Sequence, residues 1–434
     1  MEKSGKFFRD GISRRDFVRM TGTAAFAAAA GLGASSRLAG AEAGGTDAIR
    51  VGVIGCGGRG TGAAFNCLAS APGVELVAAG DLFEDRVRGA VNSFKEKVPA
   101  EKMKITDETT FVGFDAFEKV CKTDCNYVIL AAPPGFRPQH LRAAIESGKN
   151  VFMEKPVAVD PIGYRSVCES SDMAKEKKLG IVAGTQRRHQ ANYIEIMKRI
   201  HDGAIGDIVA VQCYWNQGGL WVHEKKAEWS DMEWQCRNWL YFTWLSGDHI
   251  VEQHVHNLDV ARWAIGGVPE KLTGLGGRQV RTEAKYGNIF DHFAIEYFFP
   301  KNVHVTSTCR QINGCSGKVN ERILGTKGQA YLNGGGRIAG ENAYQYAGEN
   351  WDPYTREHTD LIESIRKGEP LNEGRQVADS TLMAIAGRMS AYTGREMSFE
   401  WVQKTSKLDI MPKKYEFGDL PVEPVAIPGT TQLI

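Results

Sequence analysis

Residues 50–60 read RVGVIGCGGRG and decide the fold of the chain. The first five of them are mostly apolar and β-branched, which predicts a short buried strand. Three glycines follow with the spacing GxGxxG, and the residues after them are typical of a helix. Between a strand and a helix, such a loop binds the pyrophosphate of a dinucleotide at the helix N-terminus. The cofactor contacts expected from this loop are Gly55, Gly57, Gly58, Arg59 and Gly60.

A carboxylate after the second predicted strand indicates which dinucleotide is bound. Residues 74–80 are largely apolar, and Asp81 follows them, 21 residues after Gly60. A carboxylate at this position accepts hydrogen bonds from the adenosine ribose and repels a 2′-phosphate, so NAD is favoured over NADP. Arg86 stands a helical turn further along the chain. The competing interpretation is a glycine-rich turn followed by an incidental aspartate.

The alternation of strand and helix continues to residue 184. The expected strands are 127–132, 150–153 and 180–184, and the expected helices are 136–147 and 161–178. This alternation predicts a parallel, doubly wound sheet. Ligands of such sheets bind beyond the carboxyl ends of the strands, and Asp81, Pro133 and Lys155 all stand at such ends.

Two short motifs at these strand ends add a family resemblance. The pair Pro133-Pro134 follows one predicted strand, and Glu154-Lys155-Pro156 follows the next. With the glycine loop, these motifs make the chain similar to the Gfo/Idh/MocA oxidoreductases over roughly residues 48–400. The resemblance implies an N-terminal Rossmann domain and a second domain with an open, largely antiparallel sheet. The fold class is therefore α/β with a C-terminal α+β domain.

The resemblance also assigns roles to residues of the first half. It makes Lys155 a catalytic residue that contacts both the reacting hydroxyl and the nicotinamide ribose. It places Pro133 and His140 on the nicotinamide side of the cofactor site, and we include Glu154 among the cofactor contacts. Elementary chemistry supports the role of the lysine, because an ammonium group beside a carbinol oxygen stabilises the negative charge that develops as hydride leaves.

Residues 247–259 read GDHIVEQHVHNLD and match the family's second motif, Gly-x-x-x-Asp-x-Gly-x-His-x-x-Asp, only in part. Aligned on its last two polar positions, the resemblance makes His256 the catalytic histidine and keeps Asp259 as the following carboxylate. Glu252 stands where the family has aspartate, and His254 stands where it has glycine. These departures put the role of position 252 in doubt.

We expect the same segment to form one helix. Positions 249, 252, 256 and 259 would then share a face, because their spacings are three and four residues. On this stripe His256 would accept the hydroxyl proton, Glu252 and Asp259 would assist catalysis, and His249 would contact substrate. Two alternatives stay open. His249, Glu252 and His256 could hold a divalent metal ion, or the stripe could be an ordinary polar helix face.

The second half has features that suit a sugar substrate. Residues 208–215, 291–298 and 303–309 alternate as strands do, with few helices between them. Gln186 and Arg188 follow the last strand of the first half, and the resemblance makes them candidate ligands for hydroxyl groups. Seven of the nine tryptophans, Trp239 among them, lie between residues 215 and 263. Flat rings among polar neighbours suit sugar rings, although an aromatic core or a subunit interface would use them as well.

The first 45 residues differ from the rest of the chain. Basic residues lead to Ser13-Arg14-Arg15-Asp16-Phe17, a small-residue run follows, and Ala39-Gly40-Ala41 has the pattern of a cleavage site. This layout is typical of a twin-arginine signal peptide and predicts export to the periplasm, although a frayed basic helix is the alternative. The expected divisions of the chain are a signal peptide and linker (1–45), a Rossmann domain (46–165), a substrate domain (166–400) and a C-terminal arm (401–434).

Composition excludes several other classes of protein. Lys plus Arg number 53 and Asp plus Glu 52, so the balanced charge gives no sign of nucleic-acid binding. The nine cysteines are odd in number and dispersed, which excludes a disulfide framework and a zinc ribbon. The sequence has no run of 18 consecutive apolar residues, so no membrane span is expected in the mature chain.

These observations predict an NAD-dependent oxidoreductase that acts on a sugar, a polyol or a sugar derivative. Since free NAD is scarce outside the cytoplasm, we expect the cofactor to be tightly bound, and we expect a homo-oligomer. One alternative is a redox-neutral enzyme that processes glycosides by transient oxidation, elimination or epimerisation, and re-reduction. A remote alternative is a sugar-binding protein without catalysis on a degenerate Rossmann scaffold.

Overall fold

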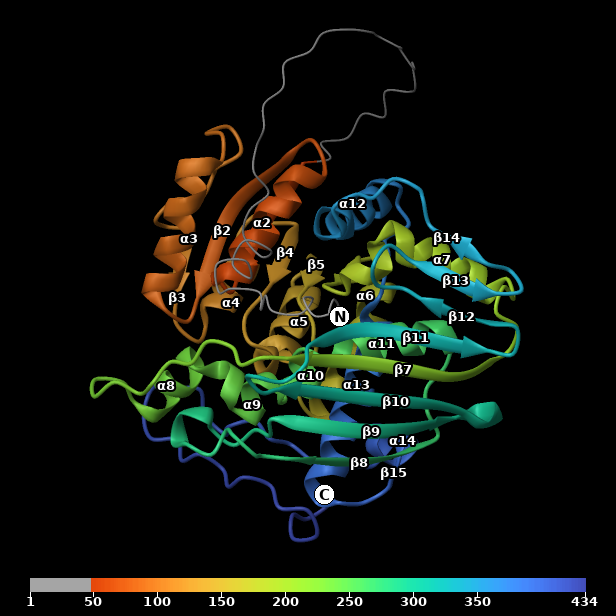
Figure 1. The fold of residues 1–434 in the computed structure, drawn as a ribbon. Coiled ribbons are helices and arrows are strands. Elements are labelled where there is room, and N and C mark those ends of the chain that lie inside the picture. Colours follow the sequence, from red (N-terminus) through yellow and green to blue (C-terminus); the bar gives the residue numbers. More distant parts are fainter. Residues whose placement is uncertain (1–47) are drawn as a thin grey trace, which may run out of the picture. The chain divides into compact units, whose positions relative to one another are not determined.

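A six-stranded parallel sheet builds the first half of the chain in this computed structural model, which describes residues 48–434 (Figure 1). The predicted signal peptide lies outside the described residues. The strands run in the order β3-β2-β1-β4-β5-β6. Their bounds are β1 Ile49–Ile54, β2 Val74–Asp81, β3 Thr110–Val112, β4 Tyr127–Leu130, β5 Asn150–Met153 and β6 Ile181–Ala183. The order reverses between β1 and β4, which is where ligands bind in sheets of this kind.

The helices of this half cover both faces of the sheet, as doubly wound folds require. They are α2 Gly58–Ser70, α3 Glu84–Lys97, α4 Ala116–Cys121, α5 Arg137–Glu146 and α6 Pro161–Glu176. All residues of β1 except Arg50 are buried, as are all four residues of β4, which explains their continuous apolar sequences. The expected parallel sheet is confirmed.

A nine-stranded sheet builds the second half, in the order β14-β13-β12-β11-β7-β10-β9-β8-β15. Its strands are β7 Ile208–Gln217, β8 Lys271–Gly277, β9 His292–Phe299, β10 Val303–Gln311, β11 Lys318–Gly325, β12 Gly328–Tyr331, β13 Arg337–Gly340, β14 Tyr344–Gln345 and β15 Met397–Ser398. Strands β7 and β10 pair in parallel, and the other pairs are antiparallel. The expectation of a largely antiparallel second sheet is confirmed.

Helices from late in the sequence connect the two halves. The remaining helices are α7 Ala191–His201, α8 Asp231–Arg237, α9 Thr243–Ser246, α10 His249–Glu252, α11 Val255–Ile265, α12 Pro353–Arg366, α13 Gly374–Thr393 and α14 Phe399–Lys404. Helix α12 lies beside α2, and α13 packs on α6 and on β8 (Figure 1). The boundary expected at residue 165 falls within α6, and the first sheet continues beyond it with β6.

The helix expected over residues 249–259 is broken in the structure, so that prediction is wrong. Helix α10 ends at Glu252, and α11 begins at Val255. The backbone N–H groups of Gln253 and His254 both donate to the carbonyl of His249, which closes the first helix. The His254 ring lies 2.7 Å from the Ser307 hydroxyl of β10 and ties the turn to the sheet. The four polar positions therefore do not form one stripe.

The nine cysteines are all free thiols, and eight of them are buried. Only Cys315, in the connection between β10 and β11, is exposed. In the part of the chain that the structure describes, no helix is both long and apolar enough to cross a membrane.

Candidate functional site

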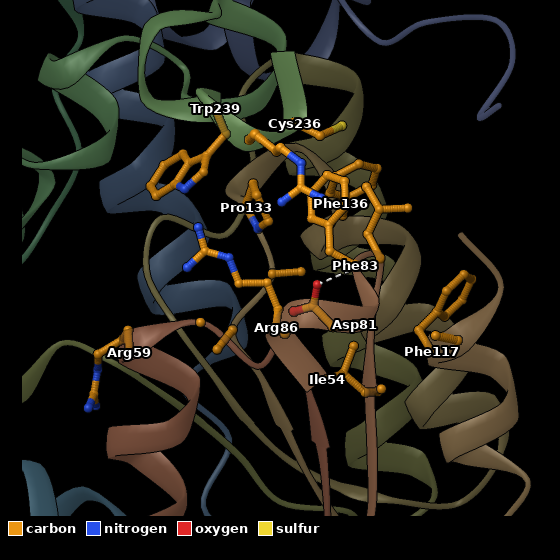
Figure 2. Close-up of a pocket in the computed structure, with 18 of the residues that line it drawn as sticks. Ile54, Arg59, Asp81, Phe83, Arg86, Phe117, Pro133, Phe136, Cys236 and Trp239 are labelled. Carbon is orange, nitrogen blue, oxygen red and sulfur yellow. Dashed lines mark hydrogen bonds between the residues drawn. The ribbon is translucent and has the colours of Figure 1, made fainter. Parts of the chain in front are cut away.

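A cavity of about 560 Å³ lies at the carboxyl ends of β1, β2 and β4 (Figure 2). Seven of the expected cofactor contacts line it, namely Gly55, Gly57, Gly58, Arg59, Asp81, Pro133 and His140. Of the expected substrate contacts, Trp239 lines it. The structure thus brings together residues that are up to 184 positions apart in the sequence, from Gly55 to Trp239.

The glycine loop is shaped for close approach of a phosphate. Gly55 has φ +93°, and a Cβ on it would lie 2.2 Å from the Ala132 nitrogen. A Cβ on Gly60 would lie 1.8 Å from the Gly55 oxygen, so helix α2 packs directly on the loop. In contrast, Gly57 and Gly58 face open space in the cavity. The first turn of α2 carries no acidic residue, so its N–H groups are available to an anion.

Asp81 ends β2 with its carboxylate held in place by the backbone. One oxygen accepts a hydrogen bond from the N–H group of Cys56 at 2.6 Å. The other accepts one from the N–H group of Phe83 at 2.9 Å (Figure 2). Burial raises the pKa of this carboxyl group, and the two hydrogen bonds act in the opposite direction. Each oxygen keeps a further lone pair for a ligand hydroxyl. The residues present therefore fit the adenosine end of NAD.

One wall of the cavity is aromatic and includes a buried histidine, His140. The His140 ring stacks on Phe117, with 4.3 Å between ring centroids, and also on Phe136. Burial, with a contribution from Arg137, lowers the pKa of His140 to about 3. Pro133 and His140 line the same cavity, and the neutral imidazole suits contact with a flat ring. Their assignment to the nicotinamide side stays a prediction.

The glycine loop is connected to the motif after β5. Arg59 donates from Nε to Glu154 at 2.5 Å, and its guanidinium lies over the Tyr354 ring. Arg59 lines the cavity. Glu154 does not line the cavity but fixes the Arg59 side chain through this hydrogen bond. Glu154 therefore acts on a bound cofactor through Arg59.

Lys155 lies at the junction of the two halves. Its amine donates to the Glu252 carbonyl at 2.8 Å and lies 3.2 Å from the Glu252 carboxylate. Both side chains are almost buried. Glu252 thus orients the lysine, which gives position 252 a role even though the family aspartate is missing.

His256 is held flat against the second sheet. Its ring stacks on Trp215, with 5.8 Å between centroids and 24° between planes. Its Nδ1 is buried and has no hydrogen-bond partner among residues 48–434. Burial, with the charges of Lys155 and Arg187, holds the pKa of His256 well below its ordinary value. The ring is therefore neutral near pH 7.

Asp259 is paired with Arg188 and does not point into the cavity. Its two oxygens accept a bidentate pair of hydrogen bonds from Arg188, at 2.8 and 2.9 Å, and a third bond from Ser380. The carboxylate is fully buried. Asp259 therefore fixes Arg188, and the expected hydroxyl ligand Arg188 is itself already paired.

The other two expected substrate contacts, Gln186 and His249, lie in different surroundings. Gln186 follows β6, and its side-chain oxygen is buried without a hydrogen-bond partner in the described part of the chain. The His249 ring packs on Phe293 with no exposed surface. A substrate cannot reach His249 without displacing this packing, so the structure does not support its expected role.

The alternative of a metal site is not supported by the arrangement of side chains. Within residues 48–434, no three His, Cys, Asp or Glu side chains are placed to hold a metal ion. His249, Glu252 and His256 point to Phe293, Lys155 and Trp215 respectively, because the helix that would have aligned them is broken.

Of one wall of the cavity, sequence reasoning named only Trp239 as a contact. Residues 221–239 of the second half contribute Trp221, His223, Cys236 and Arg237 beside Trp239. Figure 2 shows Trp239 and Cys236 on the segment that faces Asp81 and Phe83. No motif marks this segment, although the concentration of tryptophans pointed to it. The cluster divides, because Trp221 and Trp239 line the cavity while Trp234 and Trp244 are buried in an apolar core.

A parallel sheet with a glycine loop and a carboxylate at the end of its second strand, joined to an open mixed sheet, defines a two-part dinucleotide-binding protein. Family comparison agrees. The model for the oxidoreductase family with an NAD-binding Rossmann fold matches residues 49–184. The model for the Gfo/Idh/MocA C-terminal domain matches residues 193–331. The chain belongs to the Gfo/Idh/MocA oxidoreductase family.

The individual relatives described next are less than 30% identical to this chain. The chain is 27% identical over 236 residues to inositol 2-dehydrogenase 4 of Saccharopolyspora erythraea, covering 54% of this chain and 59% of that protein. It is 26% identical over 236 residues to 2,7-anhydro-N-acetylneuraminate hydratase of Escherichia coli, covering 51% and 58%. The chain thus spans about half the length of the curated relatives it matches. The structure of aldose-aldose oxidoreductase from Caulobacter crescentus superposes with a TM-score of 0.64 and 17% identity, covering 81% of this chain and 99% of that one, which shows a shared fold.

Proposed function

We propose that this chain is an NAD-dependent oxidoreductase that acts on a hydroxyl group of a sugar, a polyol or a sugar derivative. The observation that carries the proposal is the position of Lys155. Its amine follows β5, is oriented by Glu252, and lies close enough to His256 for its charge to lower the pKa of that ring. Lys155 follows directly on Glu154, which holds Arg59 of the cavity wall.

The roles of the side chains follow from their charge states. The neutral ring of His256 accepts the proton of the substrate hydroxyl. The Lys155 amine donates a hydrogen bond to the same oxygen and stabilises its developing negative charge. Glu252 keeps the lysine in place during this step. NAD, when bound, supplies the acceptor for the hydride of the carbinol carbon.

We further propose that NAD is retained between turnovers. The cavity has walls from both halves, and the segment 221–239 lies across from the Asp81 side. Such enclosure slows release of a ligand, because the halves must separate before it can leave. Retention also agrees with the proposed export of the chain through residues 1–45, since an exported enzyme meets no pool of free NAD. We propose that the active form is a homo-oligomer in the periplasm.

A sugar or polyol is the substrate class that the aromatic side chains favour. Trp215 stacks on the proposed base, His256. Aromatic faces pack on the C–H faces of sugar rings. The similarity to an inositol 2-dehydrogenase supports the same class.

A second candidate is redox-neutral processing of a sugar derivative. The observation that favours it is the similarity to a 2,7-anhydro-N-acetylneuraminate hydratase. The same residues would serve, because transient oxidation of a hydroxyl needs the same base and the same cation. The hydride would then return to the product, with no net change in the cofactor.

The test begins with protein purified without added cofactor. Denaturation followed by enzymatic assay should release near-stoichiometric NAD(H), even after extensive dialysis. A panel of sugars, polyols and glycosides is then added to the intact protein, and absorbance of reduced nicotinamide is followed. Net reduction by a polyol or sugar supports the oxidoreductase, whereas product formation without net reduction supports the redox-neutral candidate. An empty protein that does not bind added NAD contradicts both.

A further inference from the structure

Arg237, at the end of α8, joins the cavity wall of the second half to the nucleotide-binding half. Its Nη1 and Nη2 donate to the two carboxylate oxygens of Asp85 at 3.3 and 3.2 Å. Its Nε donates to Glu233 at 2.9 Å, within α8. Its guanidinium also lies 3.9 Å from the ring centroid of Phe83. Arg237 and Phe83 line the cavity, whereas Asp85 does not.

The C-terminal arm reinforces this junction from outside. Gln235 of α8 donates to the Leu420 carbonyl at 2.6 Å, and the Met232 N–H donates to Gly418 at 3.1 Å. Directly before these two points on the arm, Phe417 approaches Phe83 with 6.0 Å between ring centroids and 14° between planes. The arm therefore contacts α8 and the β2–α3 connection together and limits their separation.

We propose that Arg237 is a cofactor-retaining residue: its contacts with Asp85 and Phe83 latch the two halves over the adenosine end of the cavity and set the rate of NAD release. The inference rests on the proposed function, because it requires the dinucleotide to occupy this cavity. Phe83 is two residues from Asp81, so the latch closes directly beside the position of the adenosine ribose. A dinucleotide leaving between the halves must first break the ion pair and unstack the guanidinium.

Two properties distinguish this contact from simple apolar packing: it requires an arginine, and it is weakened by salt. An arginine meets a carboxylate with two parallel hydrogen bonds and also stacks on an aromatic face, which lysine cannot do in the same way. Asp85 is exposed, so its attraction to Arg237 is screened by salt. Release of the cofactor from the parent protein should therefore become faster as salt rises.

The experiment measures the release rate of NADH from the full-length protein. NADH bound to the protein is displaced by excess NAD, and its fluorescence is excited through tryptophan, since Trp221 and Trp239 line the cavity. Arg237→Gln should release NADH ~10-fold faster, having lost an ion pair and a cation–π contact. Asp85→Asn should release it ~3-fold faster through the ion pair alone. Both variants should lose the salt dependence of the parent.

Arg88→Gln is the matched control. Arg88 lies on α3, the helix that also carries Asp85, and pairs with Glu84 at 2.7 Å. It does not line the cavity. Its loss should leave the release rate unchanged. Release at the parent rate from both Arg237→Gln and Asp85→Asn overturns the latch while leaving the proposed function intact. A parent protein that binds no NADH overturns the proposed function instead. If Arg237→Gln fails to fold, Asp85→Asn decides alone, because its side chain is outside the cavity.

Discussion

Lys155 is the residue whose loss should separate chemistry from binding. It does not line the cavity, and its amine is held by Glu252. We expect Lys155→Met to bind NAD like the parent and to lower turnover by ~10³, as removal of a preorganised electrostatic stabiliser does. Substrate-dependent reduction of the cofactor measures the effect, and Lys122→Met, on the exposed surface, serves as control. Turnover within tenfold of the parent would exclude the proposed role.

The lowered pKa of His256 leads to a prediction about the pH dependence of the reaction. Its pKa is lowered well below the ordinary value by burial and by nearby cations, so the ring stays neutral as pH falls through 6.5. The parent should therefore show no acidic limb near pH 6.5 that belongs to this residue. His256→Gln should lower kcat/KM by about 10²–10⁴ at every pH without changing the shape of the profile. A limb near pH 6.5 that disappears in the variant would contradict this account.

We propose that Asp81 and Arg86 together set the preference between NAD and NADP. Arg86 lines the same cavity, and the acid with which it forms an ion pair, Asp85, lies 4.0 Å away. Asp81→Ala should weaken NAD binding by ~1–3 kcal/mol through lost hydrogen bonds to a charged group. It should also improve binding of NADP, because Arg86 then faces a 2′-phosphate without a competing carboxylate.

Titration of the Asp81→Ala variant with both cofactors measures the preference. The double variant with Arg86→Gln should lose the gain for NADP. An unchanged ratio of NAD to NADP affinity in Asp81→Ala would show that Asp81 does not reach the ribose.

At the scale of elements, one buried histidine joins the end of the first sheet to α12 and α13. His189 Nδ1 lies 2.6 Å from Asp360, and Nε2 lies 3.4 Å from Glu373. Burial opposes the charged form, yet the two carboxylates raise the pKa of His189 to about 10. A pKa raised on folding adds stability that is complete below the unfolded value of about 6.5 and is lost as pH rises through 10.

His189→Asn should therefore lower the free energy of unfolding most below pH 6.5, by about 3–5 kcal/mol, the cost of removing one partner of a buried pair. The difference from the parent should shrink as pH approaches 10. Urea unfolding at several pH values measures it. His304→Asn is the control, since it removes only an exposed histidine–carboxylate pair, with Glu296. A difference that grows with pH would contradict the assignment.

The elements also show what the sequence could and could not predict. The glycine loop, Asp81 and Lys155 were predictable because each follows an apolar strand, and parallel strands bring their carboxyl ends to one edge. The break between α10 and α11 was not, since helical periodicity carries no information about the bond of His254 to Ser307 on a distant strand. Arg188 likewise looked like a free ligand until folding placed it against Asp259.

At the scale of the whole molecule, the C-terminal arm is a structural part of the cofactor half. We expected an arm after residue 400, and the structure lays it on the chain's own surface. Tyr415 and Phe417 pack on Phe114, with ring centroids 6.1 and 5.3 Å away, and Tyr415 also packs on Phe136. The same aromatic cluster lies behind the cavity, which Phe114 and Phe136 line.

A chain that ends at Leu408 should therefore melt at least ~5 °C lower than the parent, because it exposes this aromatic cluster. It should also release NADH faster. A chain that ends at Pro421 is the matched control, since it keeps the bonds of Gly418 and Leu420 to α8. Equal melting temperatures and release rates for the two truncations would show that residues 409–421 do not brace the cavity.

The order in which these walls are made constrains when the nucleotide can be enclosed. The glycine loop and Asp81 emerge from the ribosome first, the wall of residues 221–239 emerges much later, and the bracing residues 410–420 come almost last. Domains fold in that order during synthesis. A nascent chain can thus present the phosphate-binding loop but cannot close over a dinucleotide. Closure of these walls over the cofactor is consequently expected only after translation ends.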